Sequence, residues 1–150
     1  MITGKMNSNK ILQKNDFSTL VPHAGSMLLI DEVLNYSQET IVTRCVSHQN
    51  PDHPLRLNGK LSALHLIEYG AQTMAVHCGL LSGQAHSGFL AAVRAAHFYV
   101  EALEAVQNAL IIHATAEAQL EKGAVYHFFI RDSQDNLLLE ARATVVHLSS

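Results

Sequence analysis

Glu68 is the residue whose type and position point most directly to chemistry. Between Lys60 and Arg94 it is the only side chain with a full charge at neutral pH, and it falls among apolar residues spaced three and four apart. Burial disfavours the charged form of a carboxyl group and raises its pKa. A carboxylic acid that stays protonated near neutral pH can act as a general acid. The alternative is a carboxylate that reaches solvent at the edge of the apolar stripe, or one that bonds to Gln72 or His65.

His53 is the candidate base among the ten histidines. It lies between Asp52 and Pro54, in an irregular segment before a predicted helix, where a side chain can be aimed into a cleft. His65 competes for the role, but it lies three residues from Glu68, and such neighbours face each other and leave little room for a substrate. Four further histidines are expected to be structural or at the surface: His97, His113, His127 and His147.

No sequence pattern supports a metal site, a nucleophilic residue or a nucleotide-binding site. Cys45 and His48 form a single Cys-x-x-His pair, which is a weak zinc signal because residues three apart on a strand point to opposite faces. The sequence contains no HExxH and no GxSxG, and Cys78 falls on an apolar helix face, where an inert thiol is expected. We therefore predict no metal and no cofactor.

Composition predicts one compact domain. The 150 residues are 48% hydrophobic and 15% charged, with a net charge of -3 and no basic run, which argues against nucleic acid as a partner. Two cysteines without a CxxC pattern indicate reduced thiols and a cytoplasmic protein. The domain is expected to span residues 1–150, with 1–15 as a flexible lead-in. The uncharged stretch 69–93 contains several polar residues and does not predict a membrane span.

Hydrophobic periodicity predicts two strands, one long helix and four more strands. The first two strands cover 27–36 and 41–47 and form a hairpin. The helix starts at the cap residue Ser62 and ends at residues 82–83, and its apolar face is expected to contain Leu64, Ile67, Ala71, Met74, Ala75 and Cys78. The later strands cover 89–100, which is apolar on both faces and expected to be buried on both sides, then 109–120, 124–131 and 137–148. An α+β fold with a curved antiparallel sheet around a central helix follows.

Three segments carry a family resemblance. Residues 20–34 (LVPHAGSMLLIDEVL) are similar to an opening motif L-P-H-x-x-P-x-L-L-(I/V)-D-x-V, residues 68–72 (EYGAQ) to a helix motif E-x-x-A-Q, and residues 88–94 (GFLAAVR) to a strand motif G-(F/Y)-L-x-(G/A)-(I/V)-x. In this order they resemble the 3-hydroxyacyl-acyl-carrier-protein dehydratases, hotdog-fold enzymes of fatty acid synthesis. The loop at 52–56 departs from that family's G-H-F-P-G, and His53 lies one residue farther from Glu68. This looser pattern resembles the divergent dehydratase-like proteins of aryl polyene and other polyketide-type clusters.

The resemblance implies a hotdog fold and the dehydration of 3-hydroxyacyl thioesters, carried on acyl carrier protein, to trans-2-enoyl thioesters. His53 would take the C2 proton as base. Glu68 would protonate the departing hydroxyl, and Gln72 would orient that carboxyl group. The backbone N–H groups of Ala63 and Leu64, at the first turn of the helix, would polarise the thioester carbonyl. This chemistry requires neither metal nor nucleotide.

The resemblance also implies at least a homodimer, because in this family the histidine and the acid of one site come from different subunits. The apolar strand 89–100 agrees, since such a strand at a sheet edge would aggregate unless it were paired. For the acidic carrier protein, Arg56, Lys60 and Arg94 are the candidate contacts, with ordinary surface charge as the alternative. Two other functions remain open: a hotdog thioesterase that uses the helix carboxylate to activate water, and a non-catalytic acyl-binding partner subunit.

Overall fold

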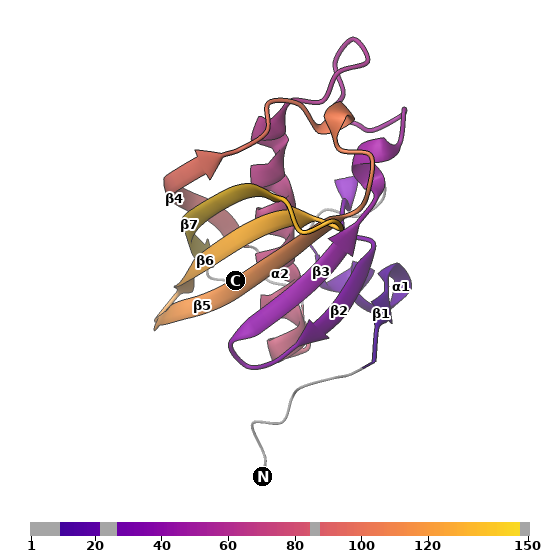
Figure 1. Ribbon diagram of the computed structural model, residues 1–150. Coiled ribbons are helices and arrows are strands. Elements are labelled where there is room, and N and C mark those ends of the chain that lie inside the picture. The colour runs from indigo at the N-terminus through magenta and orange to yellow at the C-terminus, as the bar shows by residue number, and fades with distance from the viewer. Residues whose placement is uncertain (1–9, 22–26, 85–87, 148–150) are drawn as a thin grey trace.

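A long helix, α2 (Leu66–Ser82), runs against the concave face of a curved antiparallel sheet (Figure 1). The computed structural model describes residues 10–21, 27–84 and 88–147, and the strands in these ranges are ordered β1-β2-β3-β5-β6-β7-β4 across the sheet. The strands are β1 (Leu12–Gln13), β2 (Glu32–Tyr36), β3 (Thr40–Cys45), β4 (Gly88–Phe98), β5 (Leu110–Leu120), β6 (Gly123–Asp132) and β7 (Leu137–His147). The short helical segments are α1 (Lys14–Phe17), η1 (Ser18–Leu20), η3 (Ser47–Gln49), η4 (Ala63–His65) and η5 (Leu103–Ala105).

The predicted α+β architecture is confirmed. The β2–β3 hairpin turns at residues 37–40, and η4 with α2 occupies the predicted helical segment. Along β6 the side chains of Ala124, Tyr126, Phe128 and Ile130 are buried while the intervening ones are partly exposed, which is the alternation expected of a sheet with one face on the core. No helix in the described part of the chain is long and apolar enough to cross a membrane.

Two boundaries near the N-terminus differ from expectation. The segment predicted as a flexible lead-in contains β1, which pairs with β2, and the start of α1, while residues 1–9 lie outside the described residues. The strand predicted from residue 27 begins at Glu32 instead. Leu28, Leu29 and Ile30 are buried, but side chains rather than a neighbouring strand bind much of their backbone. Residues 22–26, part of the opening motif, lie outside the described residues.

The rotation of α2 about its axis also differs from the prediction. The face against the sheet contains Leu66, Tyr69, Gly70, Thr73 and His77, all buried. The face predicted as core is mostly half-exposed or exposed: among its members Met74 is buried, whereas Leu64 is 67% exposed. Polar residues can occupy the buried face because their side chains have hydrogen-bond partners there. The Thr73 hydroxyl bonds that of Thr43 at 2.8 Å, and both ring nitrogens of His77 have partners.

Strand β4 lies at the sheet edge, paired with β7, and is not buried on both sides as predicted. Side chains 94–97 are exposed in the single chain. The apolar residues of this strand therefore indicate a surface that remains exposed in a single chain.

Candidate active site

The loop between β3 and η4 positions His53, whose side chain is only 4% exposed. Arg56 stabilises this loop, because its guanidinium donates to the carbonyl oxygens of His48, at 2.6 Å, and Gly59, at 3.1 Å. The buried His48 ring in turn bonds through Nε2 to the carbonyl oxygens of Val106 and Asn108. Arg56 therefore has a structural role in this loop. Its guanidinium already has hydrogen-bond acceptors within the chain, rather than being free to bind a carrier protein.

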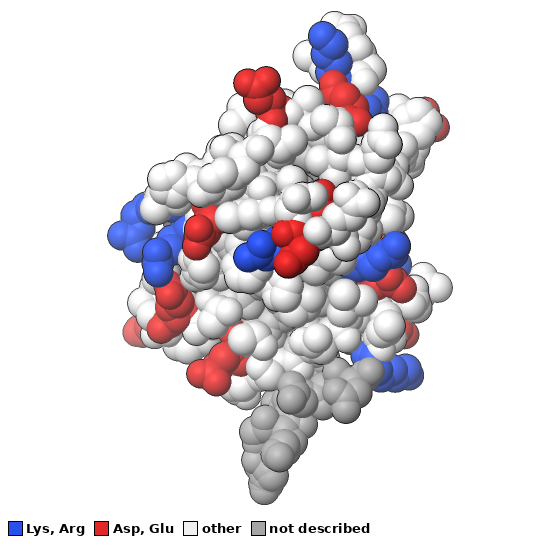
Figure 2. All heavy atoms as spheres, in the orientation of Figure 1, with Lys and Arg blue, Asp and Glu red and all other residues white. Residues whose placement is uncertain are grey.

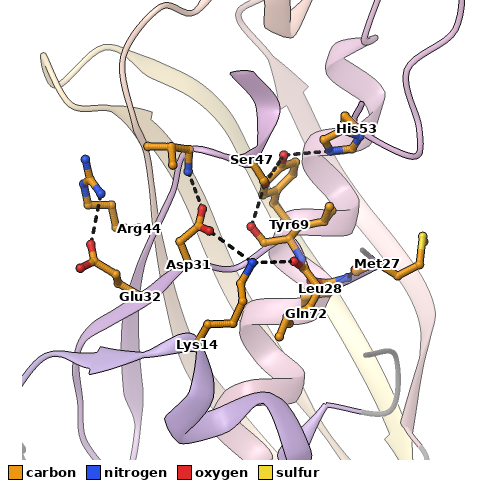
Figure 3. Close-up of polar contacts among 12 residues, drawn as sticks. Lys14, Met27, Leu28, Asp31, Glu32, Arg44, Ser47, His53, Tyr69 and Gln72 are labelled. Carbon is orange, nitrogen blue, oxygen red and sulfur yellow. Dashed lines mark hydrogen bonds and ion pairs between the residues drawn. The ribbon is translucent and has the colours of Figure 1, made fainter. Parts of the chain in front are cut away.

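The His53 ring has a defined partner at each nitrogen (Figure 3). The backbone N–H of Leu55 donates to Nδ1 at 3.1 Å, and Nε2 lies 3.1 Å from the Tyr69 hydroxyl. Burial, followed by the charge of Arg56, lowers the pKa of His53. The imidazole is therefore neutral near pH 7, as a general base must be.

Hydrogen bonds through Tyr69 and Ser47 connect His53 to the core (Figure 3). The Tyr69 hydroxyl lies 2.8 Å from Ser47 Oγ, and Ser47 Oγ donates to the carbonyl oxygen of Leu29 at 2.8 Å. Tyr69 is completely buried, and burial raises the pKa of its hydroxyl. Sequence reasoning did not identify either residue. The sequence feature that could have identified this contact was a tyrosine within an apolar helix, because a buried tyrosine hydroxyl needs a hydrogen-bond partner.

Gln72 has a different role from the one expected. Its Oε1 accepts from the Leu29 N–H at 2.7 Å, and its Nε2 donates to the Met27 carbonyl oxygen. The side chain therefore ties residues 27–29 to α2. Within the described residues it does not bond to Glu68, so the expected orientation of that carboxyl group by Gln72 is not observed.

Glu68 points away from the core of its own chain. It is exposed, whereas the next residue, Tyr69, is completely buried. Among the residues that the structure describes, Glu68 has no hydrogen bond or ion pair. The apolar surroundings predicted for this carboxyl group are therefore not supplied by the single chain, and its side chain is available to a neighbouring molecule.

The first turn of the helix does not offer the free donors that we expected. The N–H of Ala63 donates to the carbonyl oxygen of Glu101 at 3.0 Å, and the N–H of Leu64 donates to Ser62 Oγ at 3.2 Å. Ser62 acts as the predicted cap, which is the reason that Leu64 is satisfied. Both groups therefore already have acceptors in the single chain, and their role in polarising a thioester carbonyl stays a prediction.

Lys60 and Arg94 are exposed, as a carrier-protein contact requires. Figure 2 shows acidic and basic side chains mixed over the visible face, without a large patch of one sign. Ordinary surface charge therefore remains the alternative explanation for both residues.

Comparison with known proteins gives a family and a fold. A family model described as ApeP-like, ApeP dehydratase, matches residues 15–149. A search of curated proteins found no match.

Among solved structures, the dehydratase heterocomplex ApeI:P from Xenorhabdus doucetiae is similar at a TM-score of 0.76 and 24% identity, over 88% of this chain and 90% of that chain. The thioesterase HI1161 from Haemophilus influenzae follows at 0.58 and 14%, over 94% of each chain. The PaaI protein from the E. coli phenylacetic acid degradation operon is similar at 0.53 and 16%, over 74% of each chain. These likenesses identify the fold as the hotdog fold.

Proposed function

Because the chain belongs to the ApeP-like dehydratase family, and is thus an enzyme of the dehydratase type, we propose that it converts 3-hydroxyacyl thioesters to trans-2-enoyl thioesters. We further propose acyl carrier protein as the carrier of the substrate. The observation that carries the proposal is the buried His53, in a loop held by Arg56 and beside the helix that presents Glu68.

In the proposed reaction, His53 removes the proton from C2 of the substrate. Glu68, in its protonated form, donates a proton to the hydroxyl at C3, and the C3–O bond breaks to release water. The double bond forms between C2 and C3, leaving His53 protonated and Glu68 ionised. Transfer of one proton from the imidazolium to the carboxylate restores the enzyme, so that the reaction needs no other reactant.

The positions of Glu68 and Tyr69 support a site formed by two subunits. Tyr69 contacts His53 of its own chain on the buried side of α2, whereas Glu68 points outward and has no partner in the part of the chain that the structure describes. An outward carboxyl group meets a histidine most readily when that histidine comes from an adjoining subunit. Contact with the adjoining subunit would also shield the Glu68 side chain from water.

The companion subunit has two candidates. The first is a second copy of this chain, paired through the exposed edge of β4. The second is another dehydratase subunit, and the description of the similar structure as a dehydratase heterocomplex supports it. Light scattering of the purified protein distinguishes them, because a stable monomer would exclude the first.

The test compares two thioesters on acyl carrier protein, one with a 3-hydroxyacyl group and one saturated, and repeats both on coenzyme A. An enoyl product from the first substrate supports dehydration. Release of free thiol from the saturated one would instead identify a thioesterase. No reaction at all would indicate either an acyl-binding subunit or a chain that needs another dehydratase subunit for activity.

Substitutions then test the proposed roles. His53→Ala and Glu68→Gln are each expected to abolish the enoyl product, whereas Glu121→Gln, an exposed carboxylate in the β5–β6 turn, serves as the control. Full activity of either site variant would contradict its assignment, and His65 would be the next residue to test.

A further inference from the structure

Arg56 joins the two ends of the loop that contains His53. Its guanidinium donates to the carbonyl oxygen of His48, upstream of the histidine, at 2.6 Å, and to that of Gly59, downstream, at 3.1 Å. Between these two contacts, the backbone N–H of Arg56 donates to the carbonyl oxygen of His53 at 3.0 Å. The position of His53 therefore depends directly on the position of Arg56.

The positive charge of Arg56 is not neutralised by these contacts. Carbonyl oxygens are uncharged acceptors, and the guanidinium forms no ion pair with a carboxylate within residues 10–21, 27–84 and 88–147. Arg56 is one of the charges that lower the pKa of Glu104, but this carboxylate is exposed and accepts from the Leu61 N–H. An arginine side chain stays charged in proteins, so the guanidinium keeps its effect on the groups that it faces.

The His53 ring is one of these groups. Burial is the main cause that lowers the pKa of His53, and the charge of Arg56 is the second, followed by His65 of η4 and His48 of η3. Tyr69 of α2 contacts Nε2 of the ring, and burial raises the pKa of its hydroxyl, which therefore stays uncharged. In the described part of the chain, Arg56 is thus the one permanent charge among the groups that act on this ring.

We propose that Arg56 is a positioning residue for His53: its hydrogen bonds fix the loop, and its charge, which no carboxylate of the described residues neutralises, opposes a second positive charge on the ring. The inference rests on the proposed function only in assigning the base to His53. A purely structural residue would need the hydrogen bonds but not the charge. Substitution can separate the two contributions, because lysine keeps the charge on a single nitrogen, whereas glutamine keeps a donor group without the charge.

The first experiment measures the protonation of His53 without substrate, by NMR titration of protein with labelled histidine. The spectrum of His53→Ala assigns the signal. In Arg56→Gln the midpoint of the titration should rise toward pH 6.5, because the opposing charge is lost. In Arg56→Lys the midpoint should stay at the wild-type value, because the charge is kept. Equal midpoints in the wild-type protein and Arg56→Gln, or the same rise in both variants, would overturn the proposal.

Lys60→Gln is the matched control for the titration. Lys60 belongs to the same loop and is exposed, and it is not among the groups that act on the His53 ring. Its substitution removes one positive charge but none of the hydrogen bonds made by Arg56, so the midpoint should not move. A rise as large as that in Arg56→Gln would show that the net charge of the loop, rather than the placement of Arg56, is responsible.

The second experiment measures kcat, KM and the pH profile of kcat/KM for the two Arg56 variants. Loss of one positioning hydrogen bond in Arg56→Lys should lower kcat about three- to tenfold, with little change in KM and with the acid limb at the wild-type pH. In Arg56→Gln the acid limb should also move to higher pH, since a base with a raised pKa becomes protonated at higher pH. A change in KM alone would indicate a contact with the substrate carrier and would contradict the proposal.

The outcomes for this inference and for the proposed function can be told apart. If His53→Ala is inactive while both Arg56 variants keep the wild-type kcat and titration midpoint, the proposed function stands and this inference fails. If the wild-type protein alone forms no enoyl product, the midpoints still decide whether Arg56 acts on His53. Urea unfolding confirms that each variant is folded, and Arg56→Met, which keeps a long side chain without charge, repeats the titration if Arg56→Gln does not fold.

Discussion

At the scale of single residues, the site depends on two neighbours in sequence that point in different directions. Tyr69 is completely buried and bonds to His53, whereas Glu68 is exposed and has no partner among the described residues. One residue therefore serves the histidine of its own chain. Glu68 is left available for chemistry at a surface that is incomplete in the single chain.

Glu68→Gln should separate activity from stability. Removal of a general acid is expected to lower kcat about 10²- to 10⁴-fold. The free energy of unfolding should change by about 0.5 kcal/mol or less, because the side chain is exposed and makes no bond to any residue within 10–21, 27–84 and 88–147. Steady-state kinetics and urea unfolding measure the two effects, and a large loss of stability would show that Glu68 has an unrecognised structural role.

The pH dependence of kcat/KM should reflect the environment of His53. The base acts in its neutral form, so activity falls as pH decreases through the pKa of the free enzyme. Burial and Arg56 lower this pKa from 6.5, so the acid limb of kcat/KM should be centred below pH 6.5. Measurement of initial rates from about pH 5 to 8 tests this expectation, and an acid limb centred above 6.5 would contradict it.

At the scale of elements, side-chain hydrogen bonds from helix α2 decide which of its faces meets the sheet. Gln72 bonds residues 27–29, Thr73 bonds Thr43 of β3, and His77 bonds the Ser37 carbonyl oxygen. Gly70 permits close approach, because a Cβ added there would lie 2.8 Å from Cδ2 of Phe128 and closer still to its Cε2. These contacts together turn Tyr69 inward and Glu68 outward.

Gly70→Ala is therefore expected to destabilise the protein, although alanine is the better helix former. Overpacking against Phe128 should cost about 1–3 kcal/mol, offset by about 1 kcal/mol of helix propensity. Urea unfolding of Gly70→Ala, Phe128→Leu and the double variant gives the coupling between the two positions. The double variant should be more stable than the sum of the single effects predicts, and simple additivity would contradict this packing.

At the scale of the whole molecule, the exposed edge of β4 and the outward face of α2 leave the site incomplete in one chain. Leu64 of η4 and Glu68 of α2 are both exposed, and side chains 94–97 of β4 are exposed as well. An edge strand without a neighbour on one side and a carboxyl group without a partner among the described residues are both expected at a subunit interface.

Complementation between inactive variants tests the shared site. In a dimer that combines a His53→Ala subunit with a Glu68→Gln subunit, one site has both residues intact and the other has neither. Random assembly of equal amounts should restore about one quarter of the wild-type activity, since half of the dimers are mixed. Each variant alone, refolded in the same way, provides the control. An inactive mixture with confirmed subunit exchange would place both residues in one chain or assign the companion role to another protein.

The sequence by itself predicted the long helix and most of the strands, and it singled out the two candidate catalytic residues. Alternation with a period of two predicted β5, β6 and β7, and the cap at Ser62 with the glycine at 83 predicted the helical segment. A lone charge in an uncharged stretch singled out Glu68, and an irregular loop singled out His53. All of these signals are local, and each could be read within a few residues of the chain.

The tertiary structure alone decided which face of α2 is buried and which hydrogen-bonding groups are already occupied. Apolar residues surround much of the helix, so periodicity could not choose a face. The choice follows from partners distant in sequence, at residues 27–29, Thr43 and Phe128. The same distance hid the acceptor of the Ala63 N–H and the partner of His53 Nε2, because Glu101 and Tyr69 reach them only after the chain has folded.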